Sequence, residues 1–279
     1  MESALTGNNF KYMFDWFKQK AKESRPAGAQ QKPPIESMKL PVSDSESRLQ
    51  PPRLNEWPNH STWGALKNGM TLQTEDGPRF LWTVDCGGLN LPRGRLVACD
   101  PFVFLSPSDT PFIVVPKGRF PVIVTLADVS EKQDRSHIRE AYASIIFSKE
   151  VEVYRKSIPL AKEGEDRPES KGDDFIGFGV DAGTACFVDE SVIKPCMPDP
   201  RTWYKSLFEN DRTDCWFRRM DDPAHIREGI ANITLPLAKN GENLILFHSG
   251  WGDGVYPVIG SFDSAGRLLA AHIDFFVLK

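Results

Sequence analysis

The chain has 279 residues, of which 40% are hydrophobic and 26% charged, and its formal net charge is −4. This composition is typical of a soluble globular protein with one large domain or two small ones. The acidic balance excludes bulk attraction to nucleic acid, and no apolar run approaches the roughly 18 to 20 residues that span a bilayer.

The N-terminus and the cysteines both indicate the cellular compartment. The first residues lack a basic segment followed by an apolar one, so they predict no secretory signal. The five cysteines are scattered without any CxxC spacing. We therefore expect reduced thiols in a cytoplasmic protein, with neither a disulfide framework nor a structural zinc site.

Residues 1–25 are predicted to contain an amphipathic helix. Phe10, Phe14 and Phe17 form one apolar stripe of the segment 10–22, together with Met13. This stripe packs on its own domain, docks on a partner or lies on a membrane surface, and the third alternative is the weakest because the segment is short. Residues 26–58 are rich in proline and read as a semi-extended linker to a domain at residues 59–279.

From about residue 60, short apolar or β-branched runs alternate with Gly, Pro and Asp, which is typical of β-strands. The expected strands are residues 80–84, 95–98, 112–115, 122–127, 141–147, 151–153, 175–180, 185–188, 233–237, 243–247, 255–261 and 268–278. Residues 148–150 could form a hairpin, residues 263–266 have the composition of a hairpin turn, and residues 199–230 are expected to be largely helical. The pattern predicts a mainly β (α+β) fold with an antiparallel sandwich- or barrel-like core and a few helices, preceded by the tethered N-terminal helix.

The most informative segment is residues 248–254 (HSGWGDG), between two predicted strands. Its three glycines permit a sharp turn, and polar side chains on such turns are common both in binding sites and in ordinary hairpins. Trp251 and Tyr256 form either a flat recognition platform or an aromatic lid on the core.

Carboxylates also recur at the apparent strand ends, at Asp100, Asp181, Asp253 and Asp274. Brought together with His248, they could perform acid–base catalysis or hold a divalent cation. The structural alternative is that each caps a turn by accepting backbone N–H groups. Cys99, with His248 as base, is a weaker candidate nucleophile because cysteine is usually a small core residue.

Several of these segments resemble the uncharacterised DUF4241 family over about residues 85–279. The matching motifs are residues 96–101 (LVACDP), 116–122 (PKGRFPV), 179–184 (GVDAGT) with Asp189, 248–254 (HSGWGDG) and 274–276 (DFF). The resemblance implies no enzymatic activity or other established function for this chain. Members of the family are similar to proteins encoded beside bacterial toxin and effector genes, which implies an immunity or antitoxin role by association.

Two functions follow as hypotheses. The first is a non-catalytic cytosolic binding protein, an immunity protein that neutralises a cognate toxin or effector, without cofactor, nucleic acid or membrane span; its contacts would come from Phe10, Phe14, Phe17, Trp251 and Tyr256. The alternative is a hydrolase or other small-molecule enzyme that uses Asp100, Asp181, His248 and Asp253, with or without a divalent metal.

Overall fold

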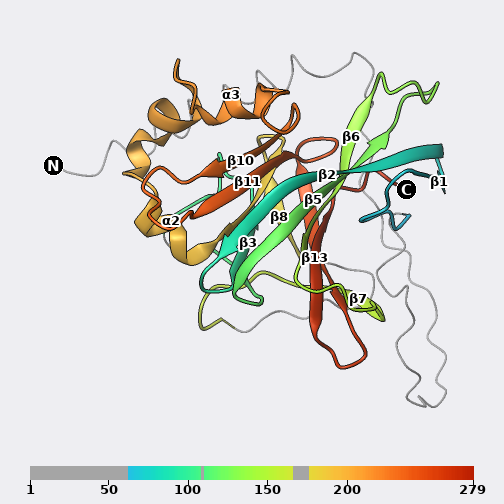
Figure 1. Cartoon of the computed structure of the whole chain (residues 1–279), viewed down its shortest axis with the longest axis horizontal. Helices are drawn as coiled ribbons and strands as arrows, with labels where there is room; N and C mark the ends of the chain where they lie inside the picture. Colours follow the sequence, from blue (N-terminus) through green and yellow to red (C-terminus); the bar gives the residue numbers. More distant parts are fainter. Residues whose placement is uncertain (1–61, 108–109, 166–175) are drawn as a thin grey trace, which may run out of the picture. The chain divides into compact units, whose positions relative to one another are not determined.

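The computed structural model describes residues 62–107, 110–165 and 176–279, and within them the chain forms two antiparallel sheets (Figure 1). In spatial order, the large sheet contains β1 (Met70–Thr74), β2 (Gly77–Leu91), β5 (Gly118–Asp128), β6 (Ile138–Ile146), β13 (Leu268–Asp274), β12 (Gly254–Phe262) and β7 (Tyr154–Ser157), with β8 (Gly177–Val180) beside β12. The small sheet contains β10 (Ile230–Thr234), β11 (Asn243–His248), β9 (Thr184–Asp189), β3 (Arg95–Cys99) and β4 (Ile113–Val114). The predicted mainly β fold is confirmed, and the large sheet is curled into a half-barrel.

The N-terminal predictions lie outside the described residues. They are the helix at residues 10–22 with Phe10, Phe14 and Phe17, and the proline-rich linker at residues 26–58.

The hydrophobic core contains side chains from both sheets. Val124 of β5 pairs with Ala143 of β6, and both side chains are fully buried. From the small sheet, the rings of Phe187 and Phe247 join the same cluster and meet edge to face with centroids 5.3 Å apart. Successive side chains along a strand point to opposite faces of the sheet, so alternate residues of each strand face this core.

The helical part of the chain is shorter than predicted and begins earlier. It consists of α2 (Glu190–Cys196), η1 (Pro200–Thr202), η2 (Tyr204–Phe208) and α3 (Trp216–Asp221). The first of these starts directly after β9, because the Asp189 carboxylate accepts the Ser191 backbone N–H at 2.9 Å and caps the helix. The prediction of helix through residue 230 is wrong, because Arg227 and Ile230 already form a β-bridge.

Of the two hairpin turns considered from the sequence, the structure contains one. The hairpin turn at residues 263–266 is confirmed: it joins β12 to β13, with Gly266 at φ 77°. The alternative of a hairpin at residues 148–150 is wrong, because β6 pairs with β5 and β13, whereas β7 pairs with β12. Strand β1 was not predicted; it forms a hairpin with the long strand β2.

No helix in the described part of the chain is both long enough and apolar enough to cross a membrane.

The Phe187–Phe247 contact provides a test of the core. We expect Phe187→Ala to lower the free energy of unfolding by about 3–5 kcal/mol, because it removes a fully buried ring and leaves a cavity. Urea unfolding of the full chain measures this change. Val114→Ala is the control, because that side chain is 63% exposed and its loss should cost less than about 0.5 kcal/mol. Equal effects of the two substitutions would contradict the assigned core.

Candidate functional site

Three turns meet where strands of both sheets end. They are the turn after β3 (residues 100–104), the turn between β8 and β9 (residues 181–183) and the glycine turn between β11 and β12 (residues 249–253). The Ser249 backbone N–H donates to the Gly183 carbonyl at 3.1 Å, and Asp253 Oδ1 accepts the Gly183 N–H at 3.2 Å. Segments about 80 and 70 residues apart in sequence are thus joined by short hydrogen bonds, which bring together the turns that carry Asp100, Asp181 and Asp253.

Asp100 is the anchor of this arrangement. Its carboxylate is fully buried and accepts three backbone N–H groups, from Asp181 (3.0 Å), Ala182 (2.6 Å) and Phe102 (3.0 Å). Burial raises the pKa of Asp100 to about 6, although the three N–H donors act in the opposite direction. A side chain with no exposed surface and three internal donors holds the backbone and cannot touch a substrate.

Tyr256 fixes the glycine turn from inside. Its side chain is only 5% exposed, and the single proton of the hydroxyl is shared between the carbonyls of Ser249 (3.0 Å) and Gly252 (2.7 Å). Burial raises the pKa of Tyr256 to about 12, so the hydroxyl remains a donor at neutral pH. Tyr256 therefore positions the turn, as a lid on the core, and does not present its ring to a partner.

Trp251, in contrast, is displayed on the same turn. It is 55% exposed, the guanidinium of Arg139 lies 5.5 Å from its ring centroid, and the ring of His137 meets it edge to face. These contacts restrict the rotamer of Trp251 and leave about half of its surface accessible.

His248 and Asp274 have other neighbours. The His248 side chain is exposed and lies against Gly229, where an added Cβ would be 2.5 Å from its Nδ1. Asp274 is fully buried at the end of β13 and accepts the Phe276 backbone N–H at 2.8 Å. Among the described residues, no group of three or more His, Cys, Asp or Glu side chains is arranged to hold a metal ion.

Cys99 lies in the core beside Cys186, with 3.7 Å between the two sulfur atoms. The hydrogen bond with Cys186, together with burial, raises the pKa of Cys99 well above its usual range. A buried, protonated thiol is a poor nucleophile, so Cys99 does not act with His248 in this arrangement.

Two exposed apolar residues next to the turns were missed in the sequence. Phe104 is 50% exposed and lies over Gly179, where an added Cβ would be 3.5 Å from its ring. Val255 is 56% exposed and is the cross-strand partner of Gly179. The only sequence signal was the GFG segment at residues 177–179, which leaves room for a ring above the strand. We call Phe104, Asp181, Trp251, Asp253 and Val255 the three-turn surface.

The sequence was compared with protein-family models, curated proteins and solved structures. A family model described as a protein of unknown function (DUF4241) matches residues 89–273, about two thirds of the chain. The chain belongs to the DUF4241 family. The DUF4241 match begins within β2 and ends within β13, so it includes all three turns. No curated protein and no solved structure matches the chain.

The raised pKa of Asp100 makes a prediction about pH. Between about pH 4 and 6 the unfolded chain has lost this proton while the folded chain retains it, so stability falls as pH rises through this window. We expect the unfolding free energy of the wild type, relative to Asp100→Asn, to decrease across this range. Unfolding in urea at several pH values measures it. Asp76→Asn, at an exposed turn, is the control for the removal of a surface carboxylate.

The Tyr256 hydroxyl provides a second test. Tyr256→Phe should lower the unfolding free energy by about 1–2 kcal/mol, because two carbonyls of the glycine turn lose a buried donor. It should also speed amide hydrogen exchange at residues 249–253. The matched control is Tyr154→Phe, because no hydrogen bond of the Tyr154 hydroxyl is found within the described residues. Unchanged exchange in Tyr256→Phe would show that the hydroxyl does not hold the turn.

Proposed function

We propose that this DUF4241 protein is a non-catalytic cytosolic binding protein, an immunity protein that neutralises a cognate toxin or effector through the three-turn surface. The observation that carries the proposal is the exposure of Phe104, Trp251 and Val255 around turns that are otherwise fixed by buried hydrogen bonds. Large apolar side chains held at the surface, with polar residues around them, are typical of protein–protein contacts.

The rigidity of the turns supports the same function. Asp100 fixes the 181–183 turn, Asp253 links it to the glycine turn, and Tyr256 fixes the glycine turn from below. A partner that binds such a surface loses little conformational entropy in ordering it, which favours tight association.

Charge indicates the kind of partner. Asp181 and Asp253 belong to the three turns, and the whole chain has a net charge of −4. A net negative charge steers a basic partner toward the protein and raises the association rate at low salt. A toxin with a basic, nucleic-acid-directed active site is such a partner, and binding there would block its substrate.

The enzyme alternative finds less support in these contacts. Asp100 is buried and its carboxylate accepts backbone N–H groups. His248 lies against Gly229. A general acid or base must reach the proton that it transfers, and Asp100 has no surface from which to do so.

The test begins with capture of partners from the native host on the full chain, followed by reconstitution with the purified partner. We expect Trp251→Ala combined with Val255→Ser to weaken the complex about tenfold or more, because these two side chains supply central apolar contacts. Affinity of the wild type should fall as salt increases. Titration calorimetry measures both effects.

Leu237→Ala is the matched control, because Leu237 is 50% exposed but belongs to the segment after β10. A chain lacking residues 1–58 separates the contribution of the N-terminal segment. A complex that is lost on this truncation and unchanged by the double substitution would contradict the three-turn surface. An activity that Asp253→Asn abolishes in a folded protein would instead establish the enzyme alternative.

A further inference from the structure

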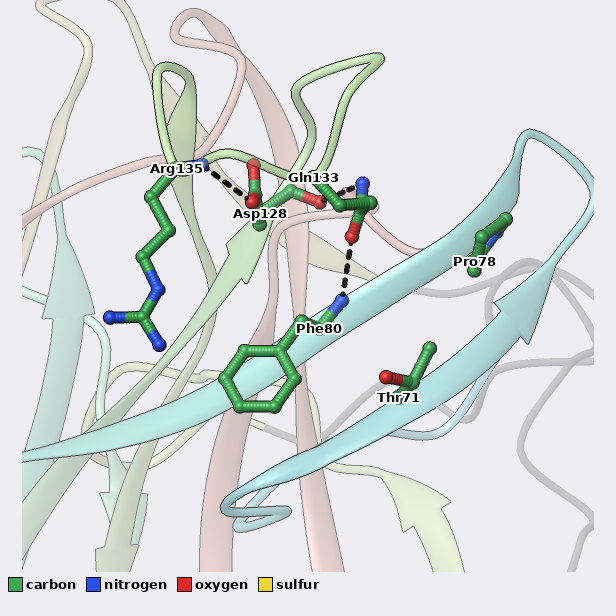
Figure 2. A pocket seen from close by; sticks show the side chains of 6 residues that line it. All are labelled: Thr71, Pro78, Phe80, Asp128, Gln133 and Arg135. Atoms are coloured by element: carbon green, nitrogen blue, oxygen red, sulfur yellow. Dashed lines mark hydrogen bonds between the residues drawn. The ribbon is translucent and has the colours of Figure 1, made fainter.

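A second site lies where β2 begins and β5 ends. Here β1, β2 and the loop after β5 enclose a half-open pocket of about 400 Å³ (Figure 2). Its lining residues are Thr71, Pro78, Phe80, Asp128, Gln133 and Arg135. A volume of this size holds a small ligand, and the wall combines apolar side chains with one cation.

The loop over this pocket has an unusual backbone. Gln133 and Arg135, both non-glycine residues, have φ values of 51° and 64°. Left-handed conformations of such residues cost about 1–2 kcal/mol each, so they persist where surrounding contacts impose them, and they are frequent at ligand-binding sites.

Those contacts come from Asp128 and from the edge of β2. The Asp128 carboxylate is buried and accepts the Arg135 backbone N–H at 2.8 Å and both the N–H and the hydroxyl of Ser130. Gln133 Oε1 accepts the Phe80 backbone N–H at 3.1 Å, as Figure 2 shows. The loop is therefore held in one conformation before any ligand binds.

The consequence is the position of the Arg135 side chain. Its guanidinium carbon lies 5.6 Å from the ring centroid of Phe80 and 5.5 Å from that of Trp82. The two rings orient the guanidinium, and no hydrogen bond or ion pair of its own is found within residues 62–107, 110–165 and 176–279. An oriented guanidinium whose donors are open is the group that binds a carboxylate with two parallel hydrogen bonds.

From this geometry we infer that the pocket binds a monocarboxylate attached to a flat apolar body, with the carboxylate on Arg135 and the body against Phe80 and Pro78. Arg135 is the single cation in the wall, and the buried Asp128 carboxylate adds a negative charge, so a doubly charged phosphate is disfavoured. Free aromatic acids and peptides that end in an aromatic residue share this chemistry. The inference does not depend on the function proposed for the three-turn surface.

The test is a titration of the full chain with three probes, followed by calorimetry and by the Arg135 side-chain N–H signals in NMR. The probes are 3-phenylpropionate, its neutral amide, and acetyl-glycyl-phenylalanine with a free carboxylate. We expect saturable binding of the acids with a dissociation constant on the order of 1 mM, and at least about tenfold weaker binding of the amide. Tighter binding of the peptide assigns the carboxylate to a chain end, and tighter binding of the free acid assigns it to a small molecule.

Variants locate the contact. Arg135→Ala should weaken both acids about tenfold or more, and Arg135→Lys should give an intermediate loss because it retains the charge without the planar fork. Arg93→Ala, an exposed arginine beyond the opposite end of β2, is the control and should bind like the wild type. Amide spectra of each variant establish that it is folded. Absence of saturable acid binding, equal binding of the amide, or wild-type affinity in folded Arg135→Ala would each overturn the inference.

Discussion

Acceptance of backbone N–H groups by buried aspartates is the interaction on which this fold depends. Asp100, Asp128, Asp189 and Asp274 are each less than 2% exposed and each accept at least one backbone N–H where a strand ends. Turns leave donors without a ladder partner, and a buried donor without an acceptor is costly. The carboxylates therefore allow tight, buried turns at the ends of strands in both sheets.

The same interaction decides what the three turns can do. A carboxylate that accepts two or three backbone N–H groups is no longer available to a metal ion or a substrate. Asp100 therefore holds the turns and takes no part in acid–base catalysis or metal binding. What the turns gain is a fixed shape, on which Phe104, Trp251 and Val255 stay exposed. This preformed shape is the basis of the binding function that we propose.

Asp128, at the end of β5, accepts backbone N–H groups in the same way, with a different outcome. There the fixed loop includes two left-handed non-glycine residues, Gln133 and Arg135, and it orients a cation over the rings of Phe80 and Trp82. The fixed turns thus keep Phe104, Trp251 and Val255 exposed, and the fixed loop orients a single guanidinium.

The sequence by itself determined the mainly β class, most strands, the hairpin turn at residues 263–266 and the family, because alternation, turn composition and motifs are local signals. It also marked Asp100, Asp181, Asp253 and Trp251 as residues at strand ends. Only the tertiary structure decided that Asp100 is buried, that Tyr256 faces inward and that His248 lies apart, since these depend on which strands pair across more than 60 residues. The positions of Phe104 and Arg135 also could not be read from the sequence. Phe104 lies over Gly179, and Arg135 lies over Phe80 and Trp82, and these contacts join residues that are distant in the chain.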